Sequence, residues 1–263
     1  MNLSKKNKER VFYTHNNVTI LHGDSLNILK EIEDESIDLI FADPPYFLSN
    51  DGISCQSGKM VSVNKGKWDK SSKYTEIEDF NYQWLFECQR ILKPNGTIWI
   101  SGTRHNIFSV GNTMLHLNYK LLNIFTWEKP NPPPNLSCRY FTHSTEQIIW
   151  ASKNQKSKHL FNYSDMRKVE KKWTKKDKQM KDVWKILPPA KHEKRYGKHP
   201  TQKPEELLEL IISSSSNDGD LVLDPFHGSG TTGVVAKRLQ RHYIGIDLEK
   251  EYLDLSIQRI NDE

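Results

Sequence analysis

Cysteine is scarce in this sequence, and its three residues are scattered along the chain. Cys55, Cys88 and Cys138 are too few and too far apart for a framework of disulfides or for a Cys-x-x-Cys zinc site. We therefore expect free thiols, a cytoplasmic protein and no bound metal. We also find no internal repeat.

Long apolar runs are absent as well. No stretch of the 263 residues reaches the ~18 consecutive apolar residues that a membrane-spanning helix needs. The first ten residues are polar and rich in lysine, which is unlike a secretory signal peptide. The sequence thus predicts a soluble protein without a membrane partner.

The excess of positive charge is small, but it is distributed unevenly along the chain. Lysine and arginine number 38 and the acidic residues 33, which gives a net charge of +5. Much of the positive charge lies in residues 167–198, where Trp173, Trp184 and Tyr196 are interleaved with lysines. Such a segment can neutralise phosphates and offer stacking surfaces, although a run of charge is also commonly a solvated helix.

Apolar periodicity predicts strands that alternate with helices. The expected strands are residues 18–21, 37–42, 97–101, 120–128, 146–152, 221–224 and 243–246, and the expected helices are residues 25–32, 79–92, 106–117, 204–213, 232–239 and 250–260. Proline and glycine in residues 93–96 predict a turn. The alternation indicates one α/β body with a doubly wound, mostly parallel sheet covered by helices on both faces.

The first loop that carries chemistry follows the expected strand 37–42 and reads Asp43-Pro44-Pro45-Tyr46. Loops at the carboxyl ends of strands are where open α/β sheets hold their ligands. Two prolines stiffen the turn and remove backbone donors, which leaves acceptors for an amine, while tyrosine can stack on a flat ring. A structural turn with a core tyrosine is the alternative interpretation.

The second loop, residues 224–232, follows the expected strand 221–224 and reads Asp-Pro-Phe-His-Gly-Ser-Gly-Thr-Thr. Its glycines allow a ligand to approach the backbone, and its hydroxyls lie near the start of a helix. Asp247 ends the next expected strand, where a carboxylate can bind the hydroxyls of a ribose. Because Gly228, Gly230 and Gly233 nearly match the dinucleotide fingerprint, a dinucleotide-dependent oxidoreductase stays open as an alternative.

Together, residues 43–46, 198–204 and 224–232 resemble the motifs of the β-class DNA amino-methyltransferases, in which the catalytic motif precedes the cofactor motif. The resemblance covers about residues 19–260. It implies a Rossmann-like methyltransferase fold, S-adenosyl-L-methionine as cofactor and DNA as partner. A non-enzymatic DNA-binding module with a degenerate methyltransferase fold is disfavoured, because neither motif is damaged.

A narrower resemblance, in residues 41–50, 61–63, 68–70, 135–146 and 198–204, is to the DpnA-like GATC adenine methyltransferases of restriction-modification systems. It implies transfer of a methyl group to N6 of adenine within GATC, in single-stranded as well as duplex DNA. Methylation of cytosine at N4 is the alternative. No cysteine lies in the Pro-Cys setting of a carbon-five methyltransferase, so we expect direct transfer without a covalent intermediate.

The resemblance also assigns roles to single residues. Those expected at the target base are Asp43, Pro44, Pro45 and Tyr46. Those expected at the cofactor are Asp24, Asp43, Thr201, Gln202, Lys203, Asp224, Phe226, Gly228, Ser229, Gly230, Thr231, Thr232 and Asp247. Asp24 is equally well interpreted as a helix cap, and His227 departs from the small or apolar residue that many relatives carry at its position.

DNA is expected to bind mainly at a target-recognition insertion. We place this insertion at residues 157–197, and the catalytic domain at residues 1–156 and 198–263. The expected DNA contacts are Arg139, Tyr140, Lys171, Lys172, Trp173, Lys175, Lys176 and Trp184. Residues 49–73 have no periodicity and are expected to close over the substrate. The sequence leaves homodimer formation open.

Overall fold

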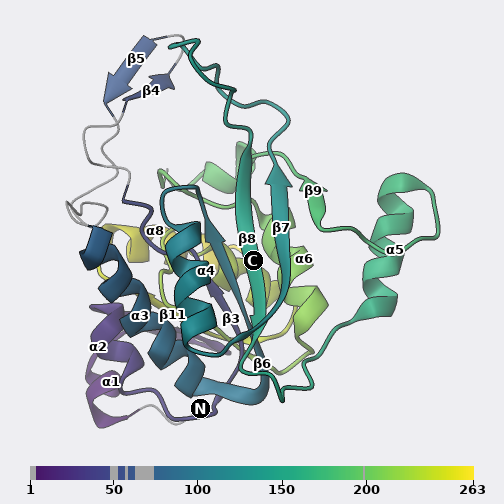
Figure 1. The fold of residues 1–263 in the computed structure, drawn as a ribbon. Helices are drawn as coiled ribbons and strands as arrows, with labels where there is room; N and C mark the ends of the chain where they lie inside the picture. The colour runs from purple at the N-terminus through teal and green to yellow at the C-terminus, as the bar shows by residue number, and fades with distance from the viewer. Residues whose placement is uncertain (1–3, 48–52, 57–58, 63–73, 198) are drawn as a thin grey trace.

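The computed structural model describes residues 4–47, 53–56, 59–62, 74–197 and 199–263 (Figure 1). Nine of the described strands form one sheet in the order β1-β2-β11-β10-β3-β6-β8-β7-β9. The bounds of these strands are β1 Val11–His15, β2 Val18–His22, β3 Ile37–Ala42, β6 Leu92–Gly102, β7 Lys120–Glu128, β8 Thr145–Ser152, β9 Val183–Lys185, β10 Leu221–Asp224 and β11 His242–Asp247.

The centre of the sheet is parallel. Neighbours from β2 through β11, β10 and β3 to β6 all pair in parallel. Antiparallel pairing joins β1 to β2 at one side and β8 to both β6 and β7 at the other, and β9 pairs in parallel with β7 at the far edge. The prediction of a doubly wound, mostly parallel sheet is therefore confirmed.

Helices cover both faces of the sheet. On one face, α2, α3 and α4 pack over a core that includes Trp84, Ile98 and Ile100, and on the other α6, α7 and α8 pack over Trp99, Val222 and Tyr243 (Figure 1). The described helices are α1 Lys5–Glu9, α2 Ser25–Leu29, α3 Tyr74–Ile91, α4 Ile107–His116, α5 Tyr163–Thr174, α6 Glu205–Ser215, α7 Thr231–Arg238 and α8 Lys250–Asn261.

The turn expected at residues 93–96 is the main local error of the sequence-based prediction. These residues lie within β6, which begins at Leu92 rather than at residue 97. The ladder to β3 nevertheless breaks there, because Ile37 pairs with Leu92 whereas Leu39 pairs with Thr97. Proline and glycine thus produce a bulge inside the strand, where a proline is tolerated because ladder bonds are interrupted.

The predicted insertion is partly built into the sheet. Within residues 157–197 the structure places α5 and β9, and Trp184 of β9 pairs with Trp127 of β7. Most of residues 49–73, for which we expect closure over the substrate, lies outside the described residues. Of that segment the structure describes β4 Ile53–Gln56 and β5 Lys59–Ser62, a two-stranded antiparallel sheet. No helix in the described ranges is long and apolar enough to cross a membrane.

Candidate active site

The two motifs meet at one cavity of about 300 Å³ at the carboxyl edge of the sheet. β10 lies beside β3 although they are far apart in sequence, so the loops after residues 42 and 224 are neighbours. All four residues expected at the target base line this cavity. So do twelve residues expected at the cofactor, namely Asp24, Asp43, Thr201, Gln202, Lys203, Asp224, Phe226, Gly228, Ser229, Thr231, Thr232 and Asp247.

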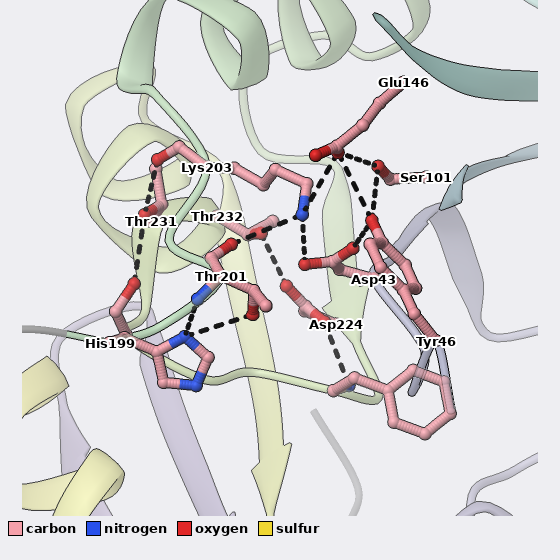
Figure 2. A network of polar contacts seen from close by, with 12 residues as sticks. Asp43, Tyr46, Ser101, Glu146, His199, Thr201, Lys203, Asp224, Thr231 and Thr232 are labelled. Carbon is pink, nitrogen blue, oxygen red and sulfur yellow. Dashed lines mark hydrogen bonds and ion pairs between the residues drawn. The ribbon is translucent and has the colours of Figure 1, made fainter. Parts of the chain in front are cut away.

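Asp43 is held on both carboxylate oxygens. The Tyr46 hydroxyl donates to Oδ1 at 2.5 Å, and the Lys203 ammonium forms an ion pair with Oδ2 (Figure 2). The same ammonium lies 5.3 Å from the centroid of the Tyr46 ring. At the other end of the motif, the Pro45 carbonyl accepts a hydrogen bond from Asn106 at 3.0 Å. The Asp-Pro-Pro-Tyr loop is thus fixed at both ends before any substrate binds.

Burial and charge act in opposite directions on this pair. Burial raises the pKa of Asp43, while the neighbouring Lys203 ammonium and the hydrogen bonds to the carboxylate lower it. For Lys203, burial opposes the charged form, but the carboxylates of Asp43 and Glu146 outweigh burial and raise its pKa. Lys203 therefore remains an ammonium at neutral pH and compensates the buried carboxylates.

Glu146 and Ser101 complete the network, and neither is assigned a role by the motifs. Glu146 Oε2 lies 3.7 Å from Lys203 Nζ and 3.4 Å from the Tyr46 hydroxyl. Ser101 lies 3.1 Å from the Tyr46 hydroxyl (Figure 2). The sequence contains one signal that could have identified them, because each is a polar residue at the end of an expected strand. Because β8 runs antiparallel, its first residues lie at the same edge as the last residues of β6.

Lys203 is expected at the cofactor, and the structure places its ammonium in contact with the catalytic motif. Its backbone carbonyl accepts a hydrogen bond from Thr231 at 3.2 Å, which ties the 199–204 segment to the second loop. Gln202 is also buried, and its amide nitrogen donates to the Glu193 carbonyl at 2.8 Å. Thr201 is held by His199, whose Nδ1 lies 3.3 Å from both its nitrogen and its hydroxyl.

The hydroxyls of the second loop were expected to face a ligand, but the structure gives each an internal partner. Thr232 donates to Asp224 at 2.5 Å, and Arg259 donates to Ser229 Oγ at 3.2 Å and to Thr231 Oγ1 at 2.9 Å. Asp224 also accepts from the Phe226 nitrogen at 3.0 Å, and burial raises its pKa to about 7. These side chains hold the shape of the loop, and Ser229, Thr231 and Thr232 also line the cavity.

Gly230 is the one expected cofactor residue that does not line the cavity. Its φ is +73°, and a Cβ there would lie 2.6 Å from the Cβ of Ser256. Glycine is required at this position because the loop turns in the left-handed region and α8 packs directly against it. Gly230 is therefore required for the shape of the loop.

His227, the departure from the motif, is a buried packing residue. Its Nδ1 lies 2.7 Å from the Tyr243 hydroxyl, and its Nε2 lies 2.7 Å from Ser256. Burial lowers the pKa of His227 to about 3, so the ring is neutral. Gly245 accommodates it, because a Cβ on Gly245 would lie 2.3 Å from His227 Nδ1. The imidazole therefore joins the loop to β11 and α8 and leaves the catalytic motif untouched.

Two carboxylates lie at the other end of the cavity. Asp247 accepts hydrogen bonds from the Gly228 nitrogen at 2.7 Å and from the Glu249 nitrogen at 2.9 Å. Asp24 caps α2 by accepting from the Leu26 nitrogen at 2.7 Å. The helix-cap interpretation of Asp24 is thus confirmed, and the same side chain also lines the cavity. Within the described part of the chain, no cluster of three acidic, histidine or cysteine side chains could hold a metal.

None of the residues expected to bind DNA lines the cavity. Lys171, Lys172, Lys175 and Lys176 are exposed, as are Trp173, Arg139 and Tyr140. Trp184, in contrast, is 3% exposed and its ring centroid lies 4.4 Å from that of Phe125. Because its ring belongs to the core, the prediction that Trp184 stacks on DNA is wrong.

Fold and site together define a class of protein. A family model described as DNA methylase matches residues 37–258, so the chain belongs to the DNA methylase family of N6 and N4 methyltransferases. This confirms the resemblance found in the sequence.

Two relatives are similar over nearly their whole length. The chain is 55% identical to the type II methyltransferase M2.LlaDCHI of Lactococcus lactis subsp. cremoris over 251 residues, which cover 95% of this chain and 91% of the relative. It is 54% identical to the type II methyltransferase M2.DpnII of Streptococcus pneumoniae over 253 residues, which cover 96% and 92%. The chain is thus an enzyme of the DNA methyltransferase class.

Solved structures agree with this assignment. The complex of M1.HpyAVI with SAM matches with a TM-score of 0.64 and 28% identity, covering 93% of this chain and all of the other. The cytosine-N4-specific PvuII DNA methyltransferase matches with a TM-score of 0.75 and 22% identity, covering 98% and 90%. The second likeness concerns the fold alone.

Proposed function

We propose that this protein transfers a methyl group from S-adenosyl-L-methionine to N6 of adenine within GATC in DNA, as the protective methyltransferase of a cytoplasmic restriction-modification system. The observation that carries the proposal is the shared cavity, in which the fixed Asp43 carboxylate lies beside a ligand-sized space lined by the second loop. Membership of the DNA methylase family and similarity to type II methyltransferases support it.

The residues around the cavity fit this cofactor. Phe80, Phe226 and Tyr252 provide apolar surface, and the Asp247 carboxylate can accept hydrogen bonds from ribose hydroxyls. Gln202 Oε1 is a buried acceptor without a hydrogen-bond partner among the described residues. Because a buried acceptor is costly to leave unpaired, the ammonium of the methionine part is a suitable partner. When bound, the cofactor supplies an electrophilic methyl group on its sulfonium.

Asp43 and the rigid Pro44-Pro45 turn would orient the amine of the target base. An exocyclic amine that donated hydrogen bonds to acceptors at the turn would have its lone pair directed away from them, into the cavity whose residues would hold the cofactor. Since the attacking nitrogen becomes positively charged, it must lose a proton, and Asp43 is the carboxylate placed to receive it. Tyr46 would contact the base through its ring, while Asp43 and Ser101 hold its hydroxyl in place.

The choice of adenine and of GATC depends on the motif resemblance. The names of the relatives describe type II methyltransferases and give no base. Cytosine N4 is the second candidate, because the family includes both amine methyltransferases.

The test is methylation of defined GATC oligonucleotides, single-stranded and duplex, with scrambled sequences as controls. Digestion to nucleosides and mass spectrometry should give N6-methyladenine from the GATC substrates alone. N4-methylcytosine would show that the alternative is right. Equal methylation of scrambled DNA would refute the recognition site, and no methylation of any DNA would refute the proposed activity.

A further inference from the structure

The loop between β7 and β8 carries the most exposed apolar side chains near the active site. It leaves the sheet at the carboxyl end of β7 and extends beyond that edge (Figure 1). Phe141 is 95% exposed, Tyr140 59% and Leu136 41%. Exposed apolar side chains that cluster on one segment mark a surface that becomes covered in a complex.

The base of this loop is joined to the catalytic network. The Lys129 nitrogen donates to the Ser144 carbonyl at 2.7 Å, which closes the stem, and the Lys129 ammonium forms an ion pair with Glu146. Glu146 in turn contacts Tyr46, whose hydroxyl donates to Asp43. The stem of the loop is therefore connected to the catalytic motif that the target base must reach.

The tip of the loop has a defined shape. Asn135 Nδ2 donates to the Tyr140 carbonyl at 2.5 Å, and Asn135 Oδ1 accepts from the Ser137 nitrogen at 3.1 Å and the Ser137 hydroxyl at 2.7 Å. Prolines at 130, 132, 133 and 134 restrict the backbone of the part of the loop that follows β7. Because the backbone is already constrained, inserting the aromatic tip into a partner costs little additional conformational entropy.

Cationic side chains surround the apolar tip. Arg139 adjoins Tyr140 in the chain and is exposed, and Arg104 lies 2.6 Å from His143 at the descending side of the loop. Tyr140 and His143 pack with ring centroids 5.3 Å apart. Aromatic rings flanked by arginines are suited to bind a nucleic acid. The arginines can pair with its phosphates, and the rings can stack on its bases.

From this geometry we propose that Phe141, supported by Tyr140, enters the duplex beside the target adenine and occupies the space that the flipped base leaves. The inference rests on the proposed function, because it requires an adenine that leaves its stack to reach Asp43. Extrusion of a base costs a few kcal/mol in unstacking, and an inserted aromatic ring offsets part of that cost. A single strand has no stacked pair to open, so the ring has much less to contribute there.

The test compares Phe141→Ala with the unchanged protein on duplex GATC DNA, on the same single strand and on a duplex with an abasic site opposite the target adenine. We expect kcat/KM to fall about tenfold or more on the intact duplex, since one base–aromatic stack corresponds to about that factor. The fall should be threefold or less, roughly, on the other two substrates. Phe141→Trp should keep the activity on the duplex, because it keeps a ring.

Phe86→Ala is the matched control, because Phe86 is a 48% exposed aromatic on α3, outside the loop. A second measurement replaces the target adenine by 2-aminopurine, whose fluorescence rises on flipping; Phe141→Ala should lower that rise in the duplex.

The outcomes separate this inference from the proposed function. An equal loss on all three substrates, an unchanged rate on the duplex, or an equal loss in the Phe86→Ala control would overturn the insertion of Phe141. If the unchanged protein methylates none of the substrates, the proposed function itself fails.

Discussion

Two polar regions of this protein are built in opposite ways. Around Asp43, Lys203 and Glu146, charged groups are buried and each contacts another at a defined distance. Along α5 and the residues after it, lysines 171, 172, 175 and 176 are exposed to solvent. The first region can select one geometry of one amine, whereas the second can attract a polyanion in many orientations. The buried region is thus expected to determine the rate of methyl transfer and the exposed region the affinity for DNA, and each property can be tested separately.

The largest effect is expected at the centre of the buried region. Asp43→Asn keeps the size of the side chain but removes the charge that Lys203 and Tyr46 hold in place. Methyl transfer should fall by about a thousandfold or more, because a preorganised group at the reacting centre is lost. Single-turnover assays measure the rate, and calorimetric titration should show that S-adenosyl-L-methionine still binds.

The matched control is Asp165→Asn, which removes an exposed carboxylate of α5 and should leave turnover unchanged. A normal rate in Asp43→Asn would show that the buried charged region is not needed for methyl transfer.

Lys203→Met should produce the next largest effect, a fall in kcat of about ten- to a hundredfold. Burial raises the pKa of Asp43 and the Lys203 ammonium lowers it, so removal of the ammonium raises that pKa further. Asp43 then becomes protonated at higher pH than before, so the acidic limb of the pH profile of kcat should move to higher pH.

Lys203→Arg keeps the positive charge, so the acidic limb of its pH profile should lie close to that of the unchanged protein. Lys153→Met is the control, because it removes a lysine that is ion-paired with Glu35 outside the cavity. An unshifted pH profile in Lys203→Met would mean that the pKa of Asp43 does not depend on the Lys203 ammonium.

The exposed region should respond differently. Replacing lysines 171, 172, 175 and 176 by glutamine should weaken DNA binding by about tenfold at low salt. It should also lower the slope of log K against log salt by ~0.9 for each phosphate that the protein no longer neutralises. At saturating DNA, kcat should stay the same. Fluorescence anisotropy over a range of salt concentrations measures both the affinity and the slope.

The same exchange at the exposed lysines 5, 6, 8 and 30 is the control for net charge, because it also removes four positive charges. Equal effects from both sets would show that α5 attracts DNA no more than any basic surface does. A changed kcat would show that the exposed region also takes part in chemistry.

The smallest effect concerns the pH dependence of stability. Burial lowers the pKa of His227 to about 3 in the folded protein, against an unfolded value of about 6.5. Below the unfolded value only the unfolded chain takes up the proton, so the stability due to the neutral imidazole is present above about pH 6.5 and lost as pH falls toward the folded pKa.

His227→Gln should reduce that loss by about 1.4 kcal/mol per pH unit, measured by urea unfolding between pH 4 and 7. His242→Gln, an exposed position, should leave the slope unchanged. An identical slope in the unchanged protein and His227→Gln would show that the ring is not a buried neutral base.

Much of the architecture could be predicted from periodicity. The strands at residues 37–42, 120–128 and 221–224 match the prediction residue for residue, because apolar and β-branched side chains predominate in each. β9 was missed, since three residues between basic segments carry no periodic signal and pair with β7 only through tertiary contacts. The buried Trp184 was misassigned for the same reason.

The site could be predicted in its motifs but not in its contacts. Asp43 and the 224–232 loop follow strand ends that the sequence reveals, so their meeting at one edge could be expected. The bond between Lys203 and Asp43, the inward hydroxyls of Ser229 and Thr232, and the use of Glu146 depend on side-chain directions that no local pattern encodes. His227 illustrates this best, because Gly245, which lies on a different strand, makes room for it.

The order of strands also bears on how the chain reaches its working form. β2 and β3 are consecutive, yet β11 and β10 lie between them, and both come from the last fifth of the sequence. During synthesis on the ribosome, β2 can pair only with β1, and β3 only with β6, until those late residues emerge. Pairing over such separations is slow to form, and the Asp43 loop has no companion loop in the interval. Methylating capacity therefore requires that residues 221–247 dock between β2 and β3.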